Sequence, residues 1–181
     1  VKHFLQNVAD DWYTEKFEDR EIREWTTEEL TDAHANVYEW FTAKDVVQTS
    51  IAWNGSTVVD IYYTRNEYTV SFDGNGGSAV APITAKYQAA ISAPEYPIKQ
   101  GYEFIWWQPV LPSNMPAENI ELVAQWSPAH ATYTVEHKLQ SLENQSEYWQ
   151  VLRDTFTWIT ESQTQAIAKI YDWFTVQDIQ Q

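Results

Sequence analysis

The sequence predicts a mainly β protein with short helices (an α+β chain), built from small repeated domains. Two observations carry this prediction, the internal repeats and the many strand-like runs. Three segments near the N-terminus return at spacings of 133 or 134 residues: Val1–Gln6 as Val135–Gln140, Trp25–Glu28 as Trp158–Glu161, and Val37–Thr42 as Ile170–Thr175. Repetition at one spacing indicates a tandem array of similar domains.

The middle of the chain is a different unit with a related start, because Tyr68-Thr69-Val70 matches Tyr133-Thr134-Val135. We therefore predict a first A repeat (1–66), a B repeat (67–128) and a second A repeat (129–181). The comparison between A repeats predicts a fragment of a longer protein, with the second A repeat ending before any counterpart of Val58–Tyr63. Repeats of this size bury small cores, so we expect neighbouring repeats to stabilise one another.

Composition excludes several functional classes. The net charge is −15, from 11 Lys and Arg against 26 Asp and Glu. Such a chain lacks the basic surface that nucleic acids and anionic membranes attract. It has no cysteine, which excludes disulfides, thiolate zinc sites and cysteine nucleophiles. It also has no apolar run long enough to cross a bilayer, so no membrane insertion is expected.

Strand signals dominate the order of elements. Val58–Tyr63 is β-branched and aromatic, and neither Pro nor Gly separates it from Tyr68–Phe72. A nearly continuous extended segment should therefore join the first A repeat to the B repeat. Asp73–Gly77 is a glycine-rich turn cluster. Glu103–Trp107 and Ile120–Trp126 alternate as half-buried strands do.

Two further segments are less regular. Ser127–Thr132 contains a proline and is the expected linker before the second A repeat. Thr26–Glu29 resembles a helix capping box, and apolar residues follow it at near-helical spacing up to Phe41, although part of the same stretch also alternates. We predict a short helix there and another over 160–171.

The B repeat resembles an internalin-B-type B-repeat at four places: Tyr68–Gly77, Pro97–Phe104, Trp107 and Ile120–Trp126. The A repeats resemble mucin-binding-protein-like repeats at Val1–Gln6, Tyr38–Thr42 and Gly55–Asn66. The resemblance implies small β-grasp-like domains strung end to end on a secreted or wall-attached bacterial surface protein. It also implies stalk, spacer or adhesion modules without catalysis or cofactors, whose partners are neighbouring repeats and a host or cell-surface protein or glycan.

The alternating strands of the B repeat supply its predicted core. Residues on the buried face of each strand should pack together. The expected core residues are Tyr68, Val70, Phe72, Tyr102, Phe104, Trp107, Leu122 and Trp126.

The chain departs from these families in one systematic way. It has ten tryptophans and five glycines, and eight tryptophans stand where the resemblance expects or suits glycine: Trp12, Trp25, Trp40, Trp53, Trp106, Trp149, Trp158 and Trp173. Some bacterial lineages read the UGA codon as glycine, while other codes read it as tryptophan. We therefore hypothesise an alternative genetic code, with glycine at these positions in the living protein. The competing interpretation is an ordinary tryptophan-rich core.

No motif points to catalysis or metal binding. The four histidines, His3, His34, His130 and His137, lack metal-site spacing, and the first and last of them occupy equivalent repeat positions. Asp73–Gly77 lacks the remaining ligand positions of a calcium loop. Adjacent acids such as Asp10-Asp11 and Glu28-Glu29 point apart instead of facing each other.

Two functions remain open. Repetition, acidity and the absence of catalytic motifs favour a structural or adhesive spacer on the bacterial surface. The 15% aromatic content suggests a carbohydrate-binding module as the alternative, because Trp and Tyr rings stack on sugars. If the eight tryptophans are glycines, most of the support for sugar binding disappears.

Overall fold

A computed structural model describes residues 1–177, with the backbone alone described for Gln150 and Val151. Contacts divide the chain into two compact units. Unit 1 comprises residues 1–73, 79–95 and 107–123, and unit 2 comprises 74–78, 96–106 and the chain from 124 onward. The last part of the predicted second A repeat, 178–181, lies outside the described residues.

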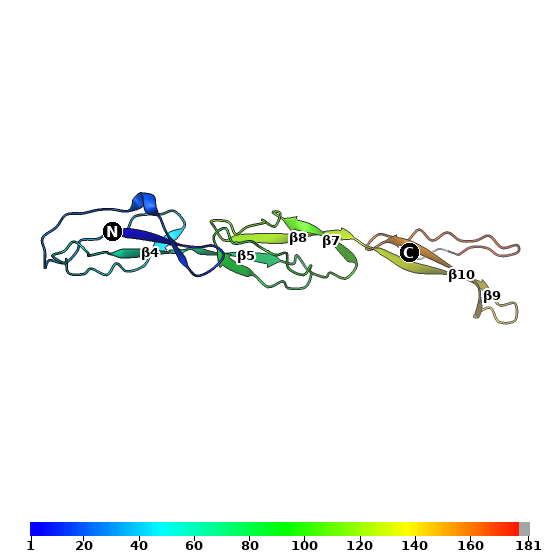
Figure 1. The fold of residues 1–181 in the computed structure, drawn as a ribbon. Coiled ribbons are helices and arrows are strands. Elements are labelled where there is room, and N and C mark those ends of the chain that lie inside the picture. The colour runs from blue at the N-terminus through cyan, green and yellow to red at the C-terminus, as the bar shows by residue number, and fades with distance from the viewer. Residues whose placement is uncertain (178–181) are drawn as a thin grey trace. The chain divides into compact units, whose positions relative to one another are not determined.

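The first sheet has the strand order β2-β1-β4-β3 (Figure 1). Its strands are β1 (Lys2–Gln6), β2 (Tyr13–Glu15), β3 (Phe41–Ala43) and β4 (Asp60–Arg65). The two central strands, β1 and β4, run parallel, while β2 and β3 add antiparallel edges. The core beside this sheet consists of Ile61 and Tyr63 on β4, Val59 just before it, and Ala33.

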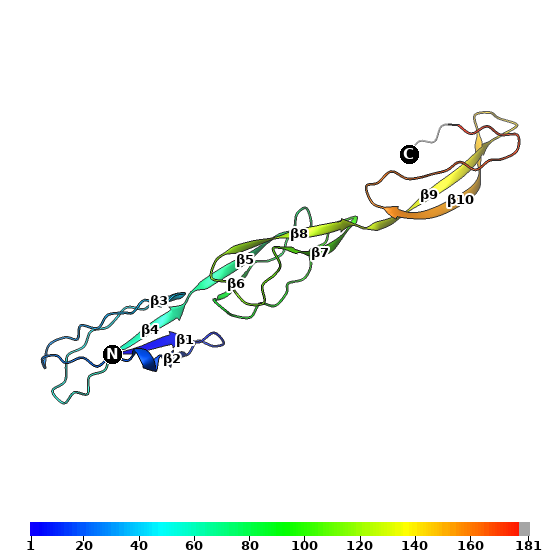
Figure 2. The same ribbon diagram turned by 90° about the horizontal axis from the view of Figure 1, so that it is seen from above.

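The second sheet repeats this topology with the order β6-β5-β8-β7 (Figure 2). Its strands are β5 (Glu67–Asp73), β6 (Ile83–Lys86), β7 (Tyr102–Gln108) and β8 (Ile120–Pro128). Again the first and last strands lie side by side and parallel, with Val70 opposite Ile120 and Phe72 opposite Leu122. The A and B repeats therefore share one plan despite their different sequences.

The third sheet is a hairpin of β9 (His130–Gln140) and β10 (Tyr148–Ile159). The strands are antiparallel, with a register shift between Gln150 and Leu152. In Figure 2, β9 lies between β10 and the chain that follows β10. Among the described residues, no strand stands beside β9 as β4 stands beside β1.

The mainly β class is confirmed, since ten strands and one short 3₁₀ helix, η1 (Phe17–Asp19), are the elements of the described residues. The predicted continuity between repeats is also confirmed, because β4 ends at Arg65 and β5 begins at Glu67. Each sheet takes all its strands from one predicted repeat, and the three-domain division itself stays a prediction. The prediction of a linker over Ser127–Thr132 is wrong, because only Ala129 separates β8 from β9.

The two predicted helices are wrong. The chain over 28–31 pairs instead with 49–51, as when Thr31 N–H donates to Thr49 O and Ile51 N–H to Glu29 O. Glu28 and Glu161 also have left-handed φ angles of 68° and 63°, which interrupt a right-handed helix. Val37 and Ile170 are almost fully exposed, so the apolar spacing that suggested helices does not correspond to a buried face.

The predicted core residues of the B repeat fall in both compact units. In unit 1, Val70, Leu122 and Trp107 are buried, Tyr68 and Phe72 are half-buried, and the Phe72 ring lies 4.9 Å from that of Trp107. In unit 2, three aromatic side chains are half-buried: Tyr102, Phe104 and Trp126. Sequence reasoning missed two buried side chains, those of Met115 and Ala124.

The glycine-rich turn holds Trp126 in place. The turn is confirmed, with Gly77 N–H donating to Gly74 O and left-handed φ angles at Asn75 and Gly76. Trp126 Nε1 donates to Gly74 O at 3.0 Å. A Cβ on Gly77 would lie 2.5 Å from the indole ring, so the ring can lie against this backbone only because residue 77 is glycine.

We expect Trp107→Ala to lower the free energy of unfolding by about 3–5 kcal/mol, because it leaves a large cavity. Trp126→Ala removes a half-buried ring and should cost about 1.5–3 kcal/mol. Urea denaturation measures both. Trp53→Ala is the control, since its ring is exposed and its removal should change stability by less than about 0.5 kcal/mol. A Trp107→Ala protein as stable as this control would exclude Trp107 from the core.

Candidate functional site

The most distinctive feature of the chain is how one repeat passes into the next. At each junction a single residue separates two strands, Asn66 between β4 and β5 and Ala129 between β8 and β9. Each junction lies wholly within one compact unit, the first in unit 1 and the second in unit 2. Residues of both neighbouring repeats bind the junction residue through its backbone.

At the first junction, Asn66 N–H donates to Trp40 O at 2.9 Å, and Tyr87 N–H donates to Asn66 O at 2.8 Å. The Trp40 and Tyr87 rings also contact, with centroids 4.6 Å apart. A second link is the ion pair of Lys86 with Asp11 at 2.7 Å, which lowers the pKa of the Asp11 carboxyl through its hydrogen bond with Lys86. The A and B repeats are thus joined by backbone, ring and charge contacts.

The second junction has the same backbone pattern. Ala129 N–H donates to Gly101 O at 2.8 Å, and Thr160 N–H donates to Ala129 O at 2.9 Å. The Thr160 hydroxyl donates to Gly101 O as well. The Tyr102 hydroxyl donates to the Glu161 carboxylate, and this bond raises the pKa of Tyr102.

Trp40 and Gly101 therefore play equivalent roles. Each supplies the carbonyl that accepts the junction N–H, and each has a left-handed backbone, with φ of 62° for Trp40 and 80° for Gly101. That geometry suits glycine, whereas a bulky residue in it is an outlier. The chain itself thus places a glycine at one junction in the position that a tryptophan fills at the other.

The other suspected glycine positions differ in backbone angle, secondary structure and exposure. Trp173, the repeat counterpart of Trp40, also has a left-handed φ of 72° and is fully exposed. Of the remaining six, Trp12, Trp25 and Trp53 lie in loops, whereas Trp106, Trp149 and Trp158 lie in strands. All of them except the half-buried Trp158 are exposed, in contrast to Trp107. Glycine at these positions remains a hypothesis.

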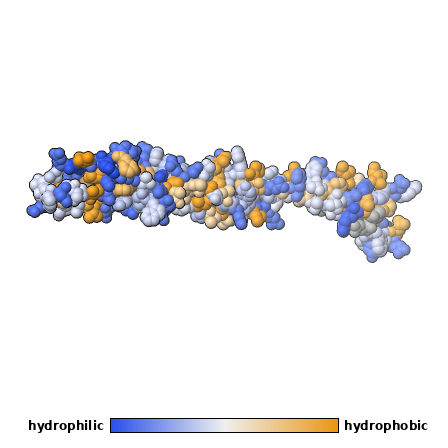
Figure 3. Space-filling model, viewed as in Figure 1, coloured by the Kyte–Doolittle hydropathy of each residue, from blue (hydrophilic) through white to orange (hydrophobic). Residues whose placement is uncertain are grey.

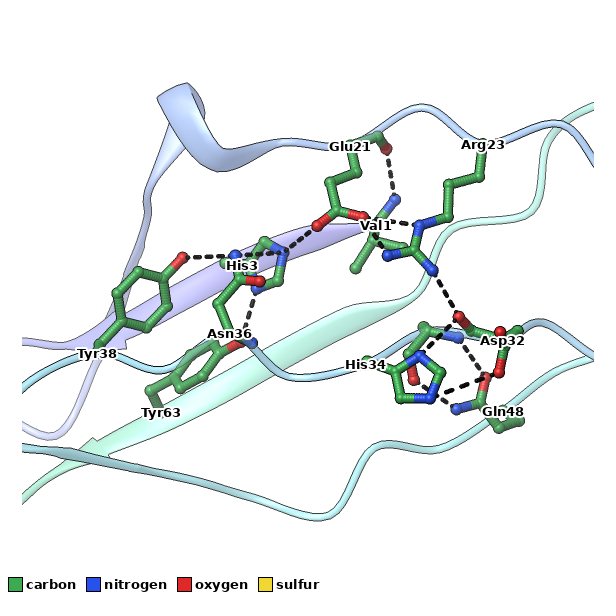
Figure 4. Close-up of polar contacts among 11 residues, drawn as sticks. Val1, His3, Glu21, Arg23, Asp32, His34, Asn36, Tyr38, Gln48 and Tyr63 are labelled. Atoms are coloured by element: carbon green, nitrogen blue, oxygen red, sulfur yellow. Dashed lines mark hydrogen bonds and ion pairs between the residues drawn. The ribbon is translucent and has the colours of Figure 1, made fainter.

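Inside the first A repeat, the central strands enclose a polar cluster around His3 (Figure 4). His3 is fully buried on β1, and its Nδ1 lies 2.7 Å from the Tyr63 hydroxyl on β4. Tyr63 accepts the backbone N–H of Asn36 at 2.8 Å, which leaves its own proton for Nδ1. The neutral imidazole then carries its proton on Nε2, facing Glu21 at 3.8 Å.

Burial controls the ionisation of this cluster. It lowers the pKa of His3, although Glu21 and Asp19 act in the opposite direction. Tyr38 donates to Asp19 at 2.6 Å; burial, followed by this bond, raises the pKa of Tyr38 to about 12. The same bond holds the pKa of Asp19 below its usual value. The cluster therefore holds a neutral histidine and a charged carboxylate at neutral pH.

The second A repeat rebuilds part of the cluster. His137, the counterpart of His3, is buried on β9 and lies 3.3 Å from Asp154, the counterpart of Glu21 at the repeat spacing. Lys169 pairs with Asp154 at 2.8 Å and lowers the pKa of that carboxyl. A buried histidine beside an acidic residue is thus a feature of both A repeats.

The histidines do not share one site. His3 and His137 are buried in different repeats, and His34 and His130 are exposed elsewhere. Within residues 1–177, no group of His, Asp and Glu side chains could hold a metal ion. The paired acids also serve no common site, because Asp11 binds Lys86 while Glu28 and Glu29 are exposed.

The middle of the chain matches a known family. Residues 68–109 match the family model of the Listeria-Bacteroides repeat domain, a bacterial surface repeat family. This supports a bacterial surface repeat at the B repeat. The finer assignments, to internalin-B-type B-repeats and mucin-binding-protein-like repeats, stay predictions.

Two relatives come from Evansella cellulosilytica. One, named a putative membrane protein, is 43% identical over 70 residues, which is 34% of this chain and 10% of that protein. The other, named a putative Gly-rich membrane protein, is 50% identical over 42 residues, or 23% of this chain and 5% of that protein. The matched segment thus covers a tenth or less of either relative. In the part of the chain that the structure describes, no helix is long and apolar enough to cross a membrane.

The left-handed backbone at Trp40 gives a test of the glycine hypothesis. Trp40→Gly and Trp40→Ala both remove the ring contact with Tyr87, but only alanine keeps a Cβ at positive φ. We expect the glycine variant to be more stable than the alanine variant by about 1 kcal/mol in chemical denaturation.

Trp25 is the matched control, because it is exposed and is absent from the left-handed residues. There the order should reverse, with Trp25→Ala more stable than Trp25→Gly by about 0.4–1 kcal/mol. The same order at both positions would show that the backbone at Trp40 does not call for glycine.

The buried histidine predicts a dependence of stability on pH. Because the pKa of His3 in the folded state is lowered from 6.5, the unfolded chain binds the proton more readily. Stability is therefore present in full above pH 6.5 and is lost as pH falls below it. We expect a smaller loss between pH 7.5 and pH 5.5 for His3→Gln than for the parent chain, measured by urea denaturation at each pH. An equal loss in both proteins would remove His3 as the cause.

Proposed function

We propose that this chain is a non-catalytic spacer segment of an extracellular bacterial surface protein, in which tandem repeats hold a fixed end-to-end order. The observation that carries the proposal is the pair of junctions. A flexible linker leaves its backbone groups to water, whereas Asn66 and Ala129 each have their N–H and C=O bound by the repeats on either side. Such joints transmit pulling force and limit bending.

The side-chain contacts at the joints support the same role. Lys86 with Asp11 at the first junction and Tyr102 with Glu161 at the second add contacts away from the backbone bridge. Contacts at two points oppose rotation about one residue. The match to a bacterial surface repeat family and the names of the relatives agree with a location on the cell surface. In this role the chain has neighbouring repeats as partners, and a host or cell-surface protein or glycan as the outer partner.

Exposed tryptophans alone do not favour the carbohydrate-binding alternative. Sugar binding needs rings that share one face, but Trp12 and Trp53 are in separate loops and the Trp40 ring contacts Tyr87. Apart from the aromatic rings, Figure 3 shows aliphatic residues interspersed with hydrophilic ones over the face that it draws. The spacer role needs no such platform.

The spacer role can be tested by measuring distances across the first junction. Because the chain has no cysteine, spin labels can be placed uniquely with Val37→Cys and Val110→Cys, at two exposed positions of unit 1 on either side of the junction. We expect a narrow distance distribution by double electron–electron resonance. Inserting Gly-Ser-Gly-Ser after Asn66 should broaden it, because the insertion separates the bridging hydrogen bonds.

The same insertion between Asn144 and Gln145, in the exposed loop between β9 and β10, is the control and should leave the distribution unchanged. A distribution in the parent chain as broad as that of the junction variant would contradict a fixed joint and, with it, the spacer proposal.

A further inference from the structure

An exposed turn of the first A repeat contains a reactive pair of residues. Asparagine stands directly before glycine at two places in the chain, Asn54-Gly55 and Asn75-Gly76. In such a pair the backbone nitrogen of the glycine can attack the asparagine side chain, because glycine has no Cβ to hinder the approach. Residues 53–56 are all exposed, so water reaches the first of the two pairs.

The backbone of this turn leaves the attacking nitrogen weakly bound. Gly55 N–H donates to Ala52 O at 3.2 Å, which is the long end of the normal range for such a bond. The turn is closed separately, by Ala52 N–H donating to the Thr57 hydroxyl at 2.7 Å. A Cβ on Gly55 would meet nothing within 4 Å. The space around this residue is therefore open to the reaction.

The side chain of Asn54 is held by its oxygen. Oδ1 accepts the Ser56 N–H at 3.1 Å and the Ser56 hydroxyl at 2.7 Å, a bond pattern that asparagine often makes two residues along a turn. Two donors aimed at one carbonyl oxygen draw electrons from Cγ and stabilise the negative charge that develops there during attack, as the donors of an oxyanion hole do. Neither bond involves Nδ2, the group that must leave.

We propose that Asn54 is a site of spontaneous deamidation, with the Gly55 nitrogen as nucleophile and Ser56 as a positioning residue. Hydroxide removes the proton of Gly55 N–H, and the nitrogen bonds to Cγ of Asn54. The bond from Cγ to Nδ2 breaks, and Nδ2 takes up a proton from water and leaves as ammonia. Water then opens the cyclic imide at either carbonyl, which gives aspartate or isoaspartate. The reaction consumes water, releases ammonia and needs no oxidant or reductant.

The pair Asn75-Gly76 is an internal comparison. The Asn75 Nδ2 donates to the backbone oxygen of Ala124 on β8 at 3.1 Å, so the fold holds the group that would leave. The backbone oxygen of Asn75 also accepts Lys99 Nζ at 3.3 Å. The folded chain should therefore distinguish two pairs that are chemically the same, whereas the unfolded chain should not.

The test incubates the full chain in mildly alkaline buffer, with and without urea, and follows both pairs by proteolysis and mass spectrometry. Chromatography separates the aspartate and isoaspartate peptides. In the folded chain we expect Asn54 to react at least about tenfold faster than Asn75, because the fold binds the carbonyl of one and the leaving group of the other. In urea the two rates should be similar. Equal rates in the folded chain, or a difference that persists in urea, overturns the proposal.

Variants of Ser56 test its positioning role. Ser56→Ala removes the hydroxyl bond to Oδ1 and should slow deamidation of Asn54 several-fold in the folded chain, while leaving the rate in urea unchanged. Ser56→Thr keeps a hydroxyl and should restore the parent rate. Ser92→Ala, at another exposed serine, is the control and should change neither rate. A folded Ser56→Ala protein that deamidates as fast as the parent would overturn the role of Ser56.

Discussion

The parallel pairing of the first and last strands of a repeat is the constraint on which the rest of the structure depends. In both complete sheets this pair is central, β1 with β4 and β5 with β8. The pairing closes a loop that contains nearly the whole repeat, so its entropic cost must be offset by burial along the two strands. The fully buried residues accordingly include Ile61 and Tyr63 on β4, and Val70 and Leu122 on β5 and β8. Among the described residues of the second A repeat, only His137 is buried.

The same pairing explains the joints between repeats. A last strand that is central and parallel to the first leaves its sheet at the end where the next repeat begins. The chain can then continue as the first strand of the next sheet after one residue, Asn66 or Ala129. That residue lies where the edges of two repeats meet, so each side can bind one of its backbone groups. The single-residue joint is thus a consequence of the fold and does not require a special linker sequence.

The sequence predicted features that depend on short-range pattern or on repetition. β-branched and aromatic residues identified β4, in which Ile61 and Tyr63 are buried and Tyr62 is exposed, and the glycine cluster identified the turn against which Trp126 packs. Sequence patterns could not show that residues 28–31 pair with residues 49–51, because that pairing joins irregular segments that lie far apart along the chain. The local capping pattern at Thr26 therefore suggested a helix that does not form. Ala124 could have been found from the alternation of Leu122, Ala124 and Trp126, whereas Met115 lies in an irregular loop without periodicity.

The junctions also bear on the meaning of the tryptophans. Trp40 contributes to the junction through its backbone. Its carbonyl accepts the Asn66 N–H, and its left-handed φ directs that carbonyl toward Asn66. At the other junction, the Gly101 carbonyl accepts the Ala129 N–H from the same left-handed backbone, and Gly101 has no side chain. The carbonyl of residue 40 can accept this hydrogen bond whatever the side chain, so the bond does not require an indole. The Trp40 ring does contact Tyr87. At this position the backbone geometry suits glycine and the ring lies against Tyr87, so Trp40 adds little support for sugar binding.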